Sequence, residues 1–193
     1  KVALHGRSFP NRAVDENFAA SYKSAVKDCY NIGVLHTALE GYAEHTTYAP
    51  CTVDELHAKG YDYWALGHVH EFQQWDGAST IVFPGNLQGR NIRETGRKGA
   101  VSVTVNDAGK SVVERLYLDV LRWEVLNVDV SDCTTLDAVA QKVGRGLSRL
   151  LEQTSVCHAV RLVLEGTTPL HGFLFGNGAA LRAQVIAQAA YID

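Results

Sequence analysis

Cysteine is scarce in this sequence, and its spacing excludes one common kind of metal site. The four cysteines among the 193 residues are Cys29, Cys51, Cys133 and Cys157, and no two of them form a C-x-x-C pair. This arrangement excludes a cysteine-based zinc knuckle, and so few cysteines in a chain of this length argue against a disulfide framework. We therefore expect four reduced and mostly structural thiols.

Methionine is absent altogether, including an initiator, and this leads us to expect that part of the gene product precedes Lys1. Long apolar runs are also missing, because none approaches the roughly 20 residues that cross a bilayer. Residues 1–6 have no charged-then-apolar signal pattern. These absences predict a cytoplasmic protein without a membrane segment.

A strong charge of either sign is lacking as well. The net charge is −3, the pI is about 6.2, and 46% of the residues are hydrophobic. This balance is typical of a folded protein with one sizeable domain or two small ones, and it argues mildly against unaided binding to duplex nucleic acid. It is compatible with a site where metal ions supply the positive charge. No phosphate-binding G-x-x-x-x-G-K-[ST] loop is present, which excludes ATP hydrolysis by this chain.

Alternating helix and strand patterns are present in the first third of the chain. Apolar residues at helical spacing predict a helix over residues 15–29, and short apolar runs predict buried strands at residues 32–35 and 63–66. Between these strands, Thr52 and Glu55 form a capping-box pattern that starts a helix ending near residue 59. This order predicts an α/β layered fold.

The sequence that follows predicts a β-rich segment and then a domain boundary. A short strand is expected at residues 81–83, and two β-rich runs around an Asn/Asp/Gly turn predict a hairpin over residues 100–118. We expect a domain boundary near residues 119–122.

A small second domain is expected beyond this boundary. Its strands are predicted at residues 123–130 and 159–164, and its helices at residues 136–151 and 179–190. Thr134 and Asp137 suggest another capping box at the start of the first helix. The β-α-β-α order indicates one sheet with helices on one face.

The most informative feature of the sequence is the placement of three histidines. His36 directly follows one predicted buried strand, and His68 and His70 follow another. Ligands in open α/β sheets bind outside the carboxyl ends of the strands, so these imidazoles are candidates for one metal site. Gly67 would allow the sharp turn that follows the second strand. Each histidine can equally be an ordinary hydrogen-bonded residue, and both interpretations stay open on spacing alone.

These residues carry a resemblance to a known family. The run Gly67–His70 resembles the G-H-x-H motif of calcineurin-like metallophosphoesterases, and Gly33–Thr37 resembles the single-histidine motif that precedes it. Asp62–Leu66 resembles the lead into G-H-x-H. Further segments resemble the DNA-repair exonuclease (SbcD-type) branch of that family, namely Phe83–Asn86, Glu94 and Lys98–Ala100.

The resemblance implies a fold, a metal centre and partners. Residues 1–120 would be the C-terminal half of a four-layer α/β/β/α metallophosphoesterase domain, and residues 121–193 a small α+β capping domain. His36 and His68 would bind one divalent ion and His70 a second, with manganese favoured and zinc, iron or magnesium open. The implied function is a DNA-repair exonuclease subunit that cuts DNA, works with an SMC-like ATPase and can form a homodimer.

The family's upstream motifs, D-x-H, G-D and G-N-H-[DE], are absent from this sequence, and the family's catalytic histidine would precede Lys1. Three neutral imidazoles do not compensate the charge of two cations. The nearby acids, expected to be solvated or capping groups, are Glu40, Glu44, Asp62 and Glu71. We therefore expect the 193 residues alone to be inactive. The alternatives are a small-molecule phosphodiesterase or phosphatase of the same fold, and a catalytically degenerate interaction module.

Overall fold

The computed structural model describes residues 1–11, 14–39, 48–152 and 155–192. The chain divides into two compact units, and each is described by itself. The first unit comprises Lys1–Gln88 and Lys98–Leu118, and the second comprises Gly89–Arg97 and Asp119–Asp193. Residues 89–97 are thus grouped with the second unit. The assignment of residues 1–120 to a catalytic half-domain and of 121–193 to a capping domain stays a prediction.

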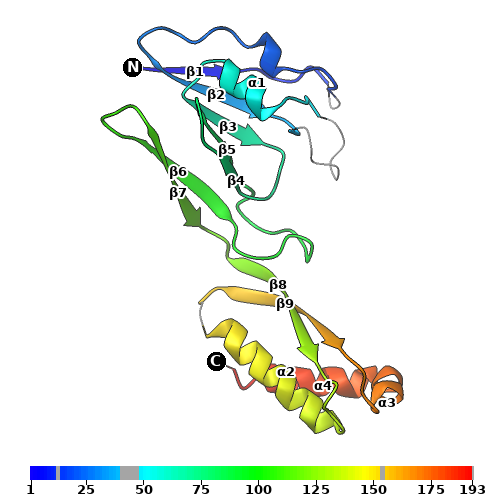
Figure 1. Ribbon diagram of the computed structural model, residues 1–193. Coiled ribbons are helices and arrows are strands. Elements are labelled where there is room, and N and C mark those ends of the chain that lie inside the picture. Colours follow the sequence, from blue (N-terminus) through cyan, green and yellow to red (C-terminus); the bar gives the residue numbers. More distant parts are fainter. Residues whose placement is uncertain (12–13, 40–47, 153–154, 193) are drawn as a thin grey trace. The chain divides into compact units, whose positions relative to one another are not determined.

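The first unit is built on a largely parallel sheet. In the described part of the chain its strands lie in the order β1, β2, β3, β5, β4 (Figure 1). In that order they span Val2–Gly6, Tyr30–His36, Tyr63–Gly67, Thr80–Phe83 and Gln73–Trp75. The strand β4 is antiparallel to β5, and the other neighbours are parallel. The predicted strands at 32–35, 63–66 and 81–83 are confirmed, whereas the sequence patterns did not indicate β1 and β4.

One face of this sheet carries the core of the unit. Trp64, Ile81 and Phe83 have no exposed surface and belong to a single apolar cluster. Leu56, from a helix on that face, completes the packing and also accepts a hydrogen bond of 3.1 Å from the indole N–H of Trp64. The one polar atom of the large indole is therefore satisfied inside the core.

The helix that supplies Leu56 is α1 (Val53–Ala58), and it begins at the predicted capping box. Thr52 Oγ1 accepts from the backbone N–H of Glu55 at 3.1 Å, and the Glu55 carboxylate accepts from the backbone N–H of Thr52 at 2.8 Å. Gly60, with φ of 75°, follows the end of the helix. The prediction of this helix and both of its ends is confirmed.

The predicted helix over residues 15–29 is wrong. Within this fully described segment the helical part is the short 3₁₀ helix η1 (Ala19–Ser21). The side chain of Asn31 accepts from the backbone N–H of Val26 at 2.7 Å and donates to the carbonyls of Val26 and Cys29 at 3.0 and 2.8 Å. These bonds occupy backbone groups that a helix would need. The apolar periodicity instead reflects burial of Phe18 and Tyr22 in the core.

A β-hairpin completes the first unit, as predicted. The strands β6 (Gly99–Val105) and β7 (Ser111–Tyr117) pair antiparallel. The side chain of Asn106 accepts from the backbone N–H of Lys110 at 2.9 Å, and Gly109 has φ of 75°. The Asn and Gly residues therefore perform the turn chemistry that the sequence indicated.

The second unit pairs two strands and packs helices on them (Figure 1). The strands β8 (Leu121–Asp129) and β9 (Cys157–Glu165) are parallel and are joined through α2 (Leu136–Leu151). Two further helices follow, α3 (His171–Gly176) and α4 (Gly178–Ala189). The predicted strands and helices are confirmed, and α3 is an addition that sequence reasoning missed.

The helix α2 begins one residue later than its predicted capping box implies. Thr135, not Thr134, is the N-cap, and its side chain accepts from the backbone N–H of Ala138 at 3.2 Å. The third helical residue is then Ala138, which has no carboxylate to complete a capping box. Asp137 lies one position too early in the helix to take that role. Burial of Val139 and Val143 still anchors the predicted apolar face.

At the level of a mixed α/β fold with a parallel sheet, the prediction is confirmed. The four-layer arrangement and the capping role of the second unit stay predictions. No helix in the described residues is long and apolar enough to cross a membrane.

Candidate metal centre

Two of the three predicted histidines are brought together at the carboxyl ends of neighbouring strands. His36 is the last residue of β2 and is the register partner of Gly67, the last residue of β3. His68 is the residue directly after the end of β3, so both histidines lie at the same edge of the sheet. Its Nδ1 is 3.2 Å from Nε2 of His36, and the two rings are nearly perpendicular, at 84°, with centroids 5.1 Å apart.

Gly67 has a different role from the predicted one. A Cβ at this position would lie 3.1 Å from Nδ1 of His36, so the missing side chain makes room for the imidazole. The positive φ of the turn falls instead on His68, at 115°. A non-glycine residue held there costs roughly 1–3 kcal/mol, and such strain is concentrated at functional sites.

His70 lies close enough to act electrostatically on His36. Protein packed around the ring of His36 lowers its pKa, and the neighbouring His70 lowers that pKa further. A lowered pKa favours the neutral imidazole, which is the form that binds metal ions. The neutral form of His36, with a lone pair available for a metal ion, is therefore favoured.

The turn that carries His68 and His70 packs against Gly85 and Lys98, which lie in two of the segments that resemble the family. Gly85 has φ of 80°, and a Cβ on it would lie 3.0 Å from the carbonyl oxygen of His70. Lys98 is 5% exposed, donates to the same carbonyl at 3.5 Å and pairs with the Glu71 carboxylate at 3.0 Å. Sequence spacing alone carries no signal for either contact.

The nearby acids do not join the histidines. Asp62 accepts a hydrogen bond of 2.6 Å from the backbone N–H of Asn31, and Glu71 pairs with Lys98. Both agree with the expected solvated or capping roles, and the predictions for Glu40 and Glu44 lie outside the described residues. Across residues 1–11, 14–39, 48–152 and 155–192, no group of three His, Cys, Asp or Glu side chains is placed to hold a metal ion.

The geometry of the histidine pair nevertheless fits two ligands of one cation. Imidazole nitrogens bind zinc at about 2.0–2.1 Å, which at a tetrahedral angle separates two of them by roughly 3.3–3.4 Å. The observed separation between His68 Nδ1 and His36 Nε2 is 3.2 Å. The two nitrogens therefore need little movement to bind one ion, while carboxylate ligands that would balance its charge are not among these neighbours.

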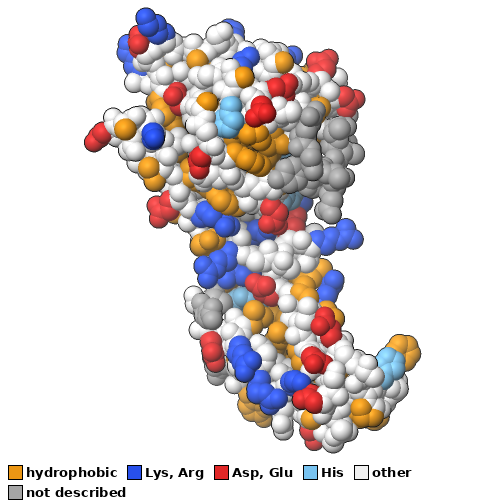
Figure 2. All heavy atoms as spheres, viewed as in Figure 1, with side chains coloured by type: hydrophobic (Ala, Val, Ile, Leu, Met, Phe, Trp, Pro, Cys, Tyr) orange, Lys and Arg blue, Asp and Glu red, His pale blue; other side chains and the backbone are white. Residues whose placement is uncertain are grey.

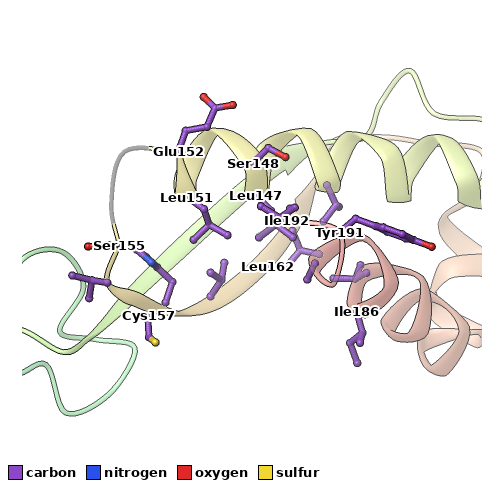
Figure 3. Close-up of a pocket in the computed structure, with 16 residues that line it drawn as sticks. Leu147, Ser148, Leu151, Glu152, Ser155, Cys157, Leu162, Ile186, Tyr191 and Ile192 are labelled. Carbon is purple, nitrogen blue, oxygen red and sulfur yellow. The ribbon is translucent and has the colours of Figure 1, made fainter.

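The second unit has a cavity of a different character. It is about 800 Å³ in volume and is lined by α2, β9, α4 and the residues after α4 (Figure 3). Leu147, Leu151, Leu162 and Ile192 are among its lining side chains, and His158 contributes a buried Nδ1 without a hydrogen-bond partner among the described residues. This lining favours an apolar occupant over a phosphate group.

Comparison with known proteins agrees with the family that the motifs resemble. The family described as metallophosphoesterase YhaO, middle domain, matches residues 123–193, which lie within the second unit. The chain is 41% identical over 170 residues to the uncharacterized metallophosphoesterase YhaO of Bacillus subtilis (strain 168), an alignment that covers 87% of this chain and 41% of that protein. The chain thus spans about two fifths of the length of the curated relative it matches. Both matches support a relationship to metallophosphoesterases.

Proposed function

We propose that the protein is a metal-dependent phosphodiester hydrolase and that His36, His68 and His70 belong to its metal centre. The observation that carries this proposal is the separation of 3.2 Å between ring nitrogens of His36 and His68 at the ends of two parallel strands. The strained backbone of His68 and the similarity to a metallophosphoesterase support the same conclusion.

The three histidines would divide between two divalent ions. His36 and His68 would hold one ion and His70 the second, with manganese as the leading candidate and zinc, iron or magnesium as alternatives. When bound, such ions polarise a phosphoryl oxygen and lower the pKa of a bound water. The protein's own contribution is to hold the imidazoles in place on rigid strand ends and to favour the neutral form of His36. The carboxylate ligands and the general acid would come from residues outside this sequence.

Metal binding by the full-length protein tests the proposal. We expect His36→Ala and His68→Ala each to remove one ion and to lower hydrolysis of bis(p-nitrophenyl) phosphate by at least about tenfold. His171→Ala, an exposed histidine on α3, is the control and should keep both properties. Unchanged metal content in the first two variants would overturn the assignment.

Within this activity, we propose DNA as the substrate, as in the DNA-repair exonuclease branch. Lys142, Arg145 and Arg149 recur at helical spacing on α2, and the two arginines are exposed. Figure 2 shows Lys and Arg side chains gathered over this helix. Such a stripe offers phosphate contacts on a protein whose net charge is otherwise negative.

The DNA proposal has its own test. Charge reversal by Arg145→Glu together with Arg149→Glu should weaken manganese-dependent cleavage of DNA while leaving hydrolysis of bis(p-nitrophenyl) phosphate intact.

A wild-type protein that hydrolyses the small diester and cleaves no DNA would instead identify a small-molecule phosphodiesterase. A full-length protein that binds no divalent ion would favour the interaction module. Partnership with an SMC-like ATPase, homodimer formation and a cytoplasmic location remain further proposals of the same resemblance.

A further inference from the structure

One aromatic ring contacts both histidines of the pair. The ring of Tyr48 stacks on His68 with a centroid distance of 5.6 Å and an interplanar angle of 10°. It meets His36 edge-on at 5.4 Å and 83°. Because the two imidazoles are themselves nearly perpendicular, a plane parallel to one is perpendicular to the other. The Tyr48 ring therefore contacts both imidazoles at once, stacked on one and edge-on to the other, and aromatic pairs prefer both geometries.

The backbone at Tyr48 is tied to the strand that carries His36. The residues that directly follow His36 bind this backbone: Ala38 N–H donates to the Tyr48 carbonyl at 2.8 Å, and Thr37 Oγ1 donates to the Ala49 carbonyl at 2.7 Å. Thr37 and Ala49 have no exposed surface, so these bonds are shielded from water. The position of the Tyr48 ring is therefore set relative to β2.

A second aromatic side chain holds the Tyr48 ring from another side. Phe9 lies 5.1 Å from Tyr48 between ring centroids and stacks on Phe18 at 4.9 Å, with an interplanar angle of 8°. Phe18 is 2% exposed and belongs to the core. Rotation of the Tyr48 ring away from the histidines would break contacts with this core.

We propose that Tyr48 is a positioning residue that holds the imidazoles of His36 and His68 at the separation needed to bind one divalent cation. The inference rests on the proposed function, because it concerns the same metal centre. An imidazole that is already oriented loses less rotational freedom when a metal binds, so the ring should raise metal affinity without touching the ion.

The test is a cobalt titration of the full-length protein, followed by the visible absorption of the bound ion. Tyr48→Leu removes the ring and keeps an apolar side chain, and it should weaken binding of the first Co²⁺ about threefold to tenfold and change the band shape. Tyr48→Phe retains the ring and should bind within about twofold of wild type. Tyr22→Leu is the matched control, because Tyr22 is a buried tyrosine that packs on Tyr61 and Trp64.

Each outcome decides the inference. If Tyr48→Leu binds Co²⁺ as wild type does while His68→Ala does not, the positioning role is wrong and the metal centre stands. If Tyr22→Leu weakens binding as much as Tyr48→Leu, the loss comes from a weakened core and the positioning role is again wrong. If His36→Ala and His68→Ala also bind normally, the metal centre and the role of Tyr48 fall together.

Discussion

Replacement of Gly85 by alanine should destabilise the first unit and disturb the turn that carries the histidines. Gly85 has φ of 80°, and an alanine Cβ would lie 3.0 Å from the carbonyl oxygen of His70 and 3.4 Å from the backbone nitrogen of Phe72. Both neighbours are backbone atoms, so neither can rotate away. The chain itself must shift at His70 to admit the methyl group.

The expected cost has two parts. A residue with a Cβ in the left-handed region costs about 1–2 kcal/mol relative to glycine. Crowding against backbone adds about 1 kcal/mol, the low end for overpacking. Gly85→Ala should therefore lose about 2–3 kcal/mol of unfolding free energy. Gly109→Ala isolates the first part, because Gly109 has φ of 75° and no atom within 4 Å of its Cβ position.

Urea denaturation of the two variants measures the difference, and a Co²⁺ titration measures its effect on the site. We expect Gly109→Ala to lose only about 1–2 kcal/mol and to bind Co²⁺ normally. Gly85→Ala should lose more stability and bind Co²⁺ more weakly. Equal losses in the two variants would refute the reasoning, since the contact with the His70 carbonyl would then contribute nothing.

Three further predictions concern residues away from the histidines. The hydrogen bond from Lys142 is the largest cause of the lowered pKa of Asp132, so Lys142→Ala should raise that pKa in an NMR titration. In the wild type, the stability that this ion pair contributes should be lost as pH falls through the folded-state pKa of Asp132. Burial raises the pKa of Tyr63 to about 12 from 10.0, so stability should fall as pH rises from about 10 to 12, and Tyr63→Phe should reduce that slope in urea titrations. Thr135→Ala should cost the second unit about 1 kcal/mol in thermal unfolding, whereas Thr134→Ala should cost much less.

Local signals in the sequence were sufficient for most of the elements. The strands at residues 30–36 and 63–67 are short and rich in apolar residues, so their composition and length identify them. The helix at residues 53–58 has a capping box whose two hydrogen bonds are both made within four residues. Such features need no knowledge of distant contacts, and the placement of His36 and His68 at strand ends follows from them.

Predictions failed where a specific hydrogen bond outside the apolar pattern decided the outcome. Residues 15–29 have a helical apolar pattern, but the side-chain amide of Asn31 accepts a hydrogen bond from the Val26 N–H and donates one to the Cys29 carbonyl. Likewise, Tyr48 reaches the histidines because the chain returns to pair with residues that follow β2. Neither effect has a periodicity or a spacing that one sequence can display.

The histidine pair depends on strand register as much as on the histidines themselves. Register places His36 opposite Gly67, and the absence of a Cβ there leaves space for the imidazole of His36. A shift by one residue would set His36 opposite a residue with a side chain and move it to the other face of the sheet. Since the buried residues Leu35 and Trp64 fix that register from the opposite face, the apolar core of the first unit is what makes the 3.2 Å separation possible.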